Sequence, residues 1–579
     1  MDAIDKMDPA ETLRYYKRRK EALWRGRSSY DAHYRELGEM FAPRTGKWGI
    51  RYDPNPGRKK HGQILEGTPE WCVLQAQAGL MAGASSPARP FFRLTTADPD
   101  LARKADVARW LKRATERVLR VFQRSNFYRA LPRIYTEMIV YGTAATTLMP
   151  HWKRVVHYTP LTAGMYAVQK GADDEVVTLY RELTLPVGQL VSEFGLANVS
   201  DRVKSLYNEG HIDTMIDVVH AIEPRHDRDP RRLDDLNMAW SSCYFEEGAQ
   251  DNRVLRMSGF PRFPALVARW NVVGDNVYGD SLCMPLLGDA RQLQHQQKRK
   301  AQGIDLQVNP PLEIPSSLKN RDVDRLPGGL TSAPSAGAGG RGITPLYQVN
   351  LDLNGLREDM DATRQRIYAG TFVDLFRMMT RDDDPQRTAY EVSVRKETQM
   401  VQLGPVYGHI QSELHEPSVD FVFERLLRAG ELDEPPEELL GAELTVQFVS
   451  TLAQAQRAVG QLPADRLIGT LQAVSTLKPD VVDGFDADEW LRRAADELGV
   501  DPHLVVPGDQ VALVREARSR AQAARQQSEV LAEQAGAARD FAQAGATAPA
   551  PQTSGAQVPP PADVLNLYTG YESPASRML

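Results

Sequence analysis

Hydrophobic and polar positions near the N-terminus recur at helical spacing and predict two helices. Residues 14–41 are charged and aromatic and contain no proline, a pattern typical of an exposed amphipathic helix that ends before Pro43. A second helix is predicted to begin with Thr68 as its N-cap and Pro69 as its first residue, and to end at Gly83. Its predicted apolar face, at positions i, i+4 and i+7, comprises Leu74, Ala78 and Met81.

The chain then changes from helical to strand-like patterning. Residues 100–123 predict a basic helix, and residues 125–150 predict another helix with a glycine-containing end. From Trp152 to Trp270 the sequence consists of short β-like runs such as VVTLYREL and MIDVVHAIEP. The combination predicts an α+β fold that is mainly helical.

Two helical stretches separated by an insertion rich in proline and glycine predict a projecting arm. Asp280 and Ser281 are expected to cap a helix that runs to about Ile304. Residues 308–349 contain short β candidates and predict a β excursion or a tip. A second helix over residues 351–376 would be about 40 Å long at 1.5 Å per residue. The apolar face of the first helix is expected to comprise Leu286, Ala290, Leu293 and Gln297.

The pattern after the arm again predicts mainly helix. Thr388 and Glu391 have the spacing of a capping box, and the helix that they begin should kink at Pro405 and break near Pro417. Its continuation, VDFVFERLLRAG, ends on Gly430, and AELTVQFVS then predicts a strand.

The C-terminal part is predicted to be helical and then disordered. The chain should be mostly helical to about Ala544, and residues 511–538 carry a thin apolar stripe that suits self-association. Residues 546–579 are rich in Pro, Gly, Ala and Ser, a composition that cannot build a core and predicts disorder.

Composition narrows the classes of protein. A chain of 579 residues exceeds one hydrophobic core, so several domains or an elongated subunit are expected. The net charge of −6 argues against a broad basic surface that grips DNA. Cys72, Cys243 and Cys283 fit no CxxC pair or disulfide pattern and indicate a reducing compartment. Without a signal-peptide pattern or an apolar run of about 20 residues, a soluble intracellular product with no membrane contact is expected.

Three adjacent carboxylates, at Asp382, Asp383 and Asp384, are the main candidate for chemistry. They are compatible with a solvated turn, with a metal-dependent catalytic centre, or with a surface that faces a polyanion. Adjacent side chains on a turn rarely converge on one ion, so no metal site is predicted. No phosphate-binding GxxxxGK[ST] loop or HExxH pair occurs, so we predict no catalytic residue and no cofactor. Surface or packing roles are expected for His295, His409 and His415.

Two basic segments are candidate nucleic-acid surfaces. Residues 100–123 also carry an apolar stripe, so we interpret them as an amphipathic helix with a cationic outer face. The stripe comprises Trp110, Leu111, Val118 and Phe122. The second segment is a basic set on the first arm helix, for which DNA and an acidic partner are both open interpretations. This set comprises Arg291, Lys298, Arg299 and Lys300.

Four stretches of sequence occur in a characteristic order. They read QAGLMAGASSPARPFFRL, SNFYRALPRIYTEMIVYGTAATTL, VYGDSLCMPLLGDARQLQHQQKRKAQGIDLQVNPPL and TAYEVSVRKETQMVQLGPVYGHIQSELHEPSVDFVFERLL. Together they resemble the head-to-tail connecting, or portal, proteins of short-tailed phages, from about Trp24 to about Val506. Phe91 and Phe92 depart from the family, in which a Trp-Phe pair is common. The glycine-rich residues 328–342 and the tail match no part of the family that we recognise.

The resemblance implies a ring, usually of twelve subunits, each with a wing, a stem of paired helices, a clip and a crown. It implies an N-terminal wing region (1–278), stem helices (279–307 and 351–377), a clip (308–350) and a tunnel loop (378–387). It further implies a wing helix and closing strand (388–450), a helical crown (451–545) and a disordered tail (546–579).

The resemblance also implies a DNA channel and partners. The tunnel loop would line the channel with Arg381, Asp382, Asp383, Asp384 and Arg387, and the basic stem set could also face it. Implied partners are further copies of the chain, double-stranded viral DNA, the terminase large subunit, tail or adaptor proteins, the major capsid protein, and scaffolding or internal core proteins. The implied location is the portal vertex of the virion, and the host cytoplasm during assembly. The alternatives are another DNA-associated virion protein, or a metal-dependent nuclease built on the Asp triplet.

Overall fold

The computed structural model describes most of the chain up to residue 454 and one further helix. The described residues are 9–313 except 50–51, 61, 63, 227, 230, 233 and 250–252, then 344–346, 352–380, 404, 406–450, 452–454, scattered positions between 470 and 491, 506 and 508–546. They belong to two compact units. One comprises Met1–Ala487 with Glu497–Gly499, and the other comprises Asp488–Asp496 with Val500–Leu579.

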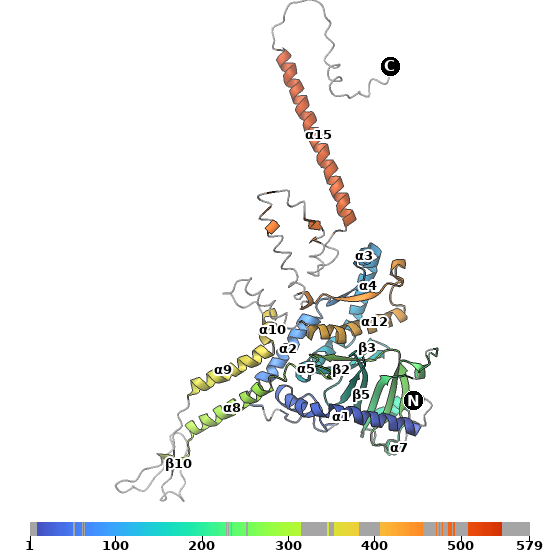
Figure 1. Cartoon of the computed structure of the whole chain (residues 1–579), viewed down its shortest axis with the longest axis vertical. Coiled ribbons are helices and arrows are strands. Elements are labelled where there is room, and N and C mark those ends of the chain that lie inside the picture. Colours follow the sequence, from blue (N-terminus) through green and yellow to red (C-terminus); the bar gives the residue numbers. More distant parts are fainter. Residues whose placement is uncertain are drawn as a thin grey trace, which may run out of the picture. The chain divides into compact units, whose positions relative to one another are not determined.

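Five helices open the first unit (Figure 1). They are α1 (Pro9–Phe41), α2 (Thr68–Ala84), α3 (Pro99–Arg103), α4 (Ala105–Arg124) and α5 (Phe127–Tyr141). The helix predicted over residues 100–123 is two helices, because Lys104 takes an extended conformation with φ −61° and ψ 132°. The helix predicted over residues 125–150 is shorter: α5 ends with Gly142 as its C-cap, at φ 77°, and residues 143–151 form a strand instead. A Cβ at Gly142 would lie 2.1 Å from the carbonyl oxygen of Gly279, so only glycine fits.

The N-cap and the buried face predicted for α2 are both wrong. The N-cap is Gly67, and the Thr68 hydroxyl donates to Glu66 Oε1 at 2.6 Å instead of capping. Leu74, at the centre of the predicted apolar face, is 52% exposed. The buried face is shifted because α2 packs against α5 and against the helix α10 (Val373–Thr380). It comprises Cys72, Val73, Ala76, Gly79, Leu80 and Gly83.

A five-stranded antiparallel sheet has the order β4-β5-β6-β7-β8. Its strands are β4 (Tyr166–Lys170), β5 (Val176–Pro186), β6 (Met215–Pro224), β7 (Trp240–Glu246) and β8 (Arg256–Phe260). β5 and β6 contain the two β-like runs singled out in the sequence, which confirms them. Because side chains alternate along a strand, Val219 on β6 faces α1 whereas Val218 faces α6 (Val187–Phe194) and α7 (Asp201–Asn208).

Two smaller sheets and a helical core complete the mixed helix-and-sheet part of this unit. We use the word wing below only as a label for this part, the described residues of 9–278 and 406–450. β2 (Thr143–His151) pairs with β3 (Val155–Pro160) and β9 (Ala265–Arg269), and β1 (Phe92–Thr96) pairs with β12 (Leu444–Phe448). A short 3-10 turn, η2 (Asp235–Asn237), precedes β7. The largest core cluster contains all four residues of the predicted α4 stripe, which confirms that this helix is amphipathic. The mixed helix-and-sheet composition confirms the α+β class.

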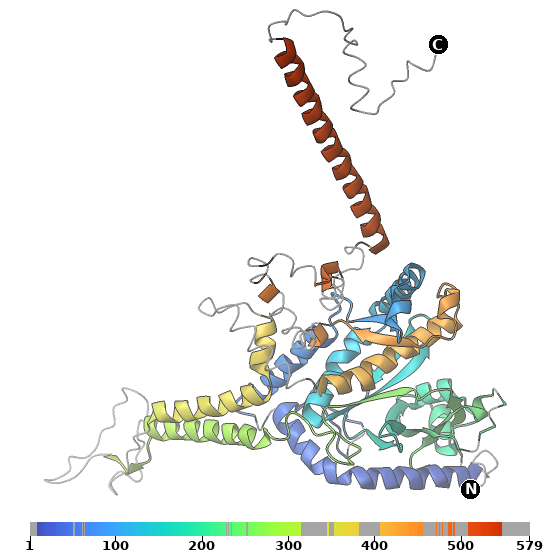
Figure 2. The same ribbon diagram turned by 45° about the horizontal axis from the view of Figure 1, so that its top comes forward.

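The rest of the first unit contains the arm and the elements after it (Figure 2). These are α8 (Leu287–Val308), β10 (Leu312–Glu313), β11 (Thr344–Pro345), α9 (Leu353–Gly370), α10, the π-helical turn η4 (Gln411–His415), α12 (Glu416–Arg428), the 3-10 turn η5 (Glu437–Leu439) and β12. The predicted break near Pro417 is wrong: residues 406–428 stay helical, and the proline is accommodated at the start of α12, directly after the π-helical turn η4. Gly430 ends this stretch, as predicted, with φ 67°.

In the second unit, α15 (Gly508–Ala546) confirms the predicted long helix. Its large apolar residues are exposed: Leu513, Val514, Val530 and Leu531. Most of residues 451–505 and all of the tail beyond residue 546 lie outside the described residues, as do the predicted capping box and the predicted kink at Pro405.

Candidate functional site: the two-helix arm and its root

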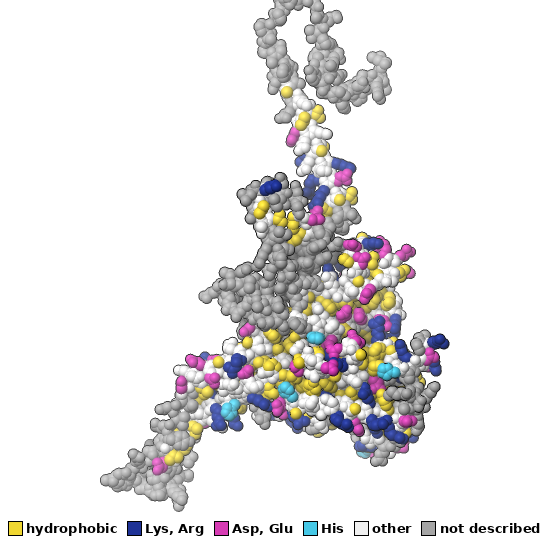
Figure 3. Space-filling model, viewed as in Figure 1, with side chains coloured by type: hydrophobic (Ala, Val, Ile, Leu, Met, Phe, Trp, Pro, Cys, Tyr) yellow, Lys and Arg dark blue, Asp and Glu magenta, His cyan; other side chains and the backbone are white. Residues whose placement is uncertain are grey.

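The arm consists of two helices side by side, α8 and α9, with a short strand pair beyond them (Figure 2). β10 and β11 pair antiparallel, Leu312 opposite Pro345, which confirms β structure at both ends of the predicted insertion. Residues 314–343, between these strands, lie outside the described residues. Acidic, basic and histidine side chains all lie on the described surface of the arm (Figure 3).

We call the root of the arm the part where residues 286–294 and 360–373 meet α2. A small apolar cluster occupies it, formed by Cys72, Leu293, Met360, Ile367 and Val373. Between the two arm helices, Arg366 Nε donates to Asp289 Oδ1 at 2.8 Å. The arm therefore has a core of its own at its root, contributed by three helices besides α8.

Gln294 fixes α8 to the segment before α2. Its Oε1 accepts from the backbone N–H groups of Leu65 and Glu66 at 2.7 and 3.0 Å, and its Nε2 donates to the carbonyl oxygen of Glu66 at 2.6 Å. The Glu66 carboxylate in turn contacts Arg364 of α9 at 3.3 Å. Because these bonds join both arm helices to one short segment, they set the direction in which the arm leaves the wing.

The first arm helix begins later than the sequence predicts. Asp280 and Ser281 do not cap it, since α8 starts at Leu287 with Leu286 at the N-cap. Asp280 instead forms a bridge with Asn271, and the Ser281 hydroxyl accepts from Met284 N at 3.0 Å. The irregular segment before α8 therefore uses the Ser281 side chain and the backbone of Asp280 for its own contacts.

The second arm helix is shorter than predicted. It ends at Gly370, and α10 starts after Thr371 and Phe372, with φ 54° at Phe372. Gly370 is closely packed at this end of α9, because a Cβ there would lie 2.5 Å from a methyl carbon of Leu286. At 1.5 Å per residue, 18 residues give α9 a length of about 27 Å rather than about 40 Å.

The structure does not bring the four predicted basic stem residues together. Arg291 forms an ion pair with Glu36 of α1 at 2.5 Å, and Arg299 lies 3.4 Å from His295 Nε2. Lys298 is exposed, Lys300 is partly buried, and neither forms an ion pair with another described residue. At 100° per residue, Lys298 shares a face with Arg291 whereas Lys300 points about 180° away, so only some of these charges could face one channel.

The predicted channel-lining acids lie outside the described residues. α10 continues to Thr380, and residues 381–387, including Asp382, Asp383, Asp384, Arg381 and Arg387, follow it directly in the chain. Among the described residues, no group of three or more His, Cys, Asp or Glu side chains is arranged to hold a metal ion.

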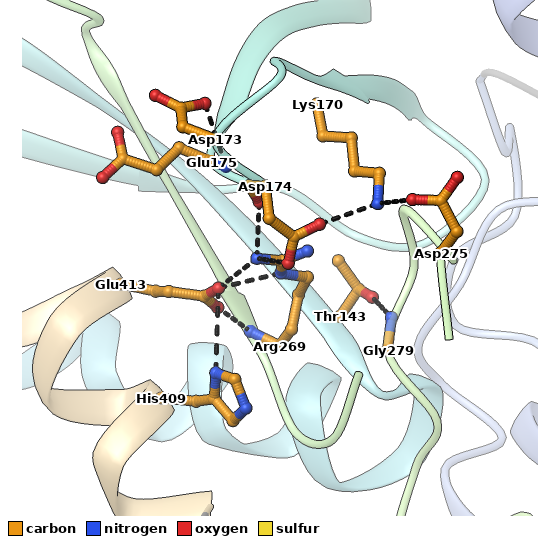
Figure 4. A network of polar contacts seen from close by, with 10 residues as sticks. All are labelled: Thr143, Lys170, Asp173, Asp174, Glu175, Arg269, Asp275, Gly279, His409 and Glu413. Carbon is orange, nitrogen blue, oxygen red and sulfur yellow. Dashed lines mark hydrogen bonds and ion pairs between the residues drawn. The ribbon is translucent and has the colours of Figure 1, made fainter. Parts of the chain in front are cut away.

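A buried ion pair joins η4, which comes later in the chain than residues 381–387, to β9 of the wing (Figure 4). Arg269 of β9 donates from Nε to Glu413 Oε1 of η4 at 2.8 Å, and its backbone N–H donates to Oε2 at 2.7 Å. Arg269 also donates to the carbonyl oxygen of Asp174 at 2.9 Å. Hydrogen bonding from Lys170 lowers the pKa of the Asp174 carboxyl. Residue spacing could not predict this pair, because its two residues are 144 positions apart.

His415 and the three cysteines pack inside the described structure, whereas His295 lies on its surface. His415 Nε2 lies 3.1 Å from the Tyr135 hydroxyl, and burial lowers the pKa of His415 to about 3, so this ring is neutral. His409 lies 3.9 Å from Glu413, and His295 is exposed on the arm. All three cysteines are buried and free. None of the described helices has the length and apolar character to cross a bilayer.

Comparison with known proteins gives consistent matches over most of the chain. It is 46% identical to the probable portal protein of Bordetella phage BPP-1 over 505 residues, which is 87% of this chain and 91% of that protein. It is 36% identical to the portal protein of Salmonella phage epsilon15 over 500 residues, 86% of this chain and 90% of that protein. The model of the bacteriophage head to tail connecting protein family matches residues 14–505, and the chain belongs to that family.

Proposed function

We propose that this chain is the subunit of a phage portal, the head-to-tail connector at one capsid vertex through which double-stranded DNA enters and leaves. The observation that carries this proposal is the family match over residues 14–505, which spans the wing-like part, the whole arm and the segment after it. The family is structural, and we assign the chain no catalytic residue and no cofactor.

The proposed division of the chain follows the arm. α8 and α9 are the stem helices, residues 308–350 around the β10–β11 pair are the clip, and residues 378–387 are the tunnel loop. Residues 1–278 and 388–450 form the wing, and residues 451–545 form the crown. The exposed apolar residues of α15 support self-association, since a helix with an uncovered apolar stripe gains by packing against copies of itself.

The proposed mechanism of the channel is electrostatic. DNA must slide in both directions, so strong phosphate contacts in the passage would hold it, because each neutralised phosphate adds affinity through counterion release. Repeated around a ring, Asp382, Asp383 and Asp384 form a negative collar that repels the DNA backbone, partly offset by Arg381 and Arg387. Arg291 and Lys298 are the stem charges that share one helix face.

The proposed assembly has several partners. We infer a homo-oligomeric ring of twelve subunits that docks the terminase large subunit during packaging and tail or adaptor proteins later. The major capsid protein and scaffolding or internal core proteins surround the wing at the portal vertex. Assembly takes place in the host cytoplasm.

The mass of the purified particle tests this proposal. Native mass spectrometry should give a closed ring with twelve times the subunit mass. A monomer at all concentrations that degrades DNA on addition of Mg²⁺ would contradict it and favour the nuclease alternative. A monomer that binds DNA without degrading it would favour another DNA-associated virion protein.

A further inference from the structure

A basic pocket lies in the wing, beside the C-terminal end of α1. It has a volume of about 840 Å³ and lies between α1, the loop after it and α5. Seven of its lining residues are Lys or Arg, whereas three are Asp or Glu. This local excess is opposite in sign to the charge of the whole chain, which is −6.

Two of the three acids of the pocket are already engaged. Asp53 lies 3.3 Å from Lys60 Nζ and 4.0 Å from Arg58 Nε. Glu137 is buried, and its carboxylate accepts from the Thr162 hydroxyl at 2.6 Å and from Ala163 N at 2.9 Å. The third acid, Glu39, is exposed.

Four of the seven basic side chains that line the pocket have no carboxylate partner among the described residues. They are exposed on three different segments, α1, the following loop and α5, and none forms an ion pair with a described carboxylate. They are Arg35, Arg44, Lys59 and Arg133. Because charges of one sign repel each other, this convergence costs free energy unless an anion lies among them.

The loop that carries part of this charge is held in place. Gly46 N donates to the Thr162 hydroxyl at 2.8 Å, and Lys47 N donates to the carbonyl oxygen of Ala163 at 2.9 Å. Trp48 packs edge-on against Tyr141, with ring centroids 6.1 Å apart. The segment from Gly46 to Trp48 is therefore anchored on α5 and on the loop between β3 and β4, which fixes the backbone next to Arg44 before any ligand arrives.

We propose that this pocket binds phosphate groups of the DNA backbone and is a holding site on the portal wing, separate from the acidic segment at 381–387. The inference rests on the proposed function, since DNA is the polyanion that a portal handles. Arginine and lysine side chains around a mostly polar pocket suit phosphate oxygens, which need neither apolar burial nor a fixed sequence.

An acidic protein segment is the competing ligand, and the geometry favours DNA over it. A protein segment gains most of its affinity from buried apolar anchors. The pocket has few apolar lining residues, namely Pro43, Trp48 and Pro132. Duplex DNA instead supplies closely spaced charges, about one per 1.7 Å of helix axis, to every cation in reach.

Fluorescence anisotropy with a labelled duplex of about 30 base pairs tests the proposal on the full-length protein. The pocket variant combines Arg35→Gln, Lys59→Gln and Arg133→Gln. The matched control combines Arg109→Gln, Arg117→Gln and Arg120→Gln, which removes the same charge from exposed positions on α4. At about 50 mM salt, the pocket variant should bind about tenfold more weakly than wild type, with a salt slope lower by about 0.9 for each lost phosphate contact. The affinity of the control variant for the duplex should fall by less than about twofold, because its substitutions change only the overall electrostatic potential of the protein.

Three results would overturn the proposal: equal losses in both variants, unchanged affinity in the pocket variant, or displacement of the duplex by polyglutamate as effective as by unlabelled duplex. The last result would assign the pocket to an acidic protein segment. If the triple variant does not assemble, Lys59→Glu alone, on an exposed loop position, should give the same direction of change. Ring formation by the wild-type protein separates this proposal from the proposed function. If the wild type forms rings and the pocket variant binds DNA as tightly as the wild type, only the pocket proposal is refuted. If the wild type forms no rings, the proposed portal function is refuted.

Discussion

Two ion pairs of similar length lie in very different surroundings. Arg269 and Glu413 lie inside the wing, with 4% and 16% of their side chains exposed, whereas Arg291 and Glu36 lie at the root of the arm with 51% and 49% exposed. In the wing, burial makes each partner depend on the other. At the root of the arm and in the basic pocket, water already solvates the charges. The wing therefore uses buried charge to hold its elements together, and exposed charge is available to partners.

Removing the arginine of each ion pair should give the largest difference in the free energy of unfolding. Arg269→Ala leaves Glu413 partly buried without its cation, so we expect the free energy of unfolding to fall by about 3–5 kcal/mol. Arg291→Ala, the matched change in the exposed pair, should cost about 0–1 kcal/mol. Urea denaturation followed by far-UV circular dichroism measures both. Similar small losses in the two variants would contradict the structural role assigned to buried charge.

The buried carboxyl of Glu137 sharpens the same comparison through pH. Burial raises its pKa from 4.5 to about 7. The folded state therefore holds the proton more tightly than the unfolded chain, so this contribution to stability is complete below pH 4.5 and is lost as pH rises through about 7.

We expect Glu137→Gln to remove this dependence, making the variant more stable than wild type at pH 8 by at most about 3 kcal/mol. Glu39→Gln, at an exposed position, should leave the pH profile unchanged. Denaturant midpoints measured between pH 5 and 8 report both effects. A wild-type profile that is flat over this range would mean that Glu137 is charged and satisfied in the fold.

Glycine positions at the root of the arm give a smaller effect. A Cβ at Gly79 would lie 2.1 Å from Cδ1 of Phe376, so Gly79→Ala must displace α10 and should cost about 1–3 kcal/mol. Gly288→Ala, on α8, meets nothing within 4 Å and should be neutral or stabilising by up to about 1 kcal/mol. Hydrogen exchange of α10 should increase in the first variant alone. Equal exchange in both would show that the Gly79 contact does not hold α10.

The smallest effect on stability is expected from the Asp triplet. Replacing Asp382, Asp383 and Asp384 with Asn keeps size and turn preference but removes charge, so rings should still form. DNA packaging or retention should change, and more strongly at low salt, where phosphate repulsion is least screened. In vitro packaging at several ionic strengths measures this. Normal packaging at every ionic strength would refute the electrostatic role, and loss of a bound divalent metal together with ring integrity would favour the metal interpretation.

Local patterns in the sequence predicted the elements better than their contacts. The runs in β5 and β6, the order helix, strand pair, helix in the arm, and the end of α12 near Gly430 all follow from residue spacing. The face of α2 did not, because it depends on the fit of Phe376 against Gly79, which is about 300 positions away in the chain.

The candidate site was predicted only in part, for a similar reason. Charges could be found from composition, but their pairing could not, since Arg291 is matched by Glu36 and Arg269 by Glu413 through the fold alone. The basic pocket could not be found from the sequence because only the fold brings Arg133 of α5 to the six basic lining residues between positions 35 and 60.

Electron cryomicroscopy of the assembled particle tests the central claim most directly. We expect a closed ring in which α8 and α9 of every subunit surround a central hole, with residues 381–387 at its narrowest level. A ring whose arms point away from the hole, or whose narrowest level is formed by other residues, would contradict it.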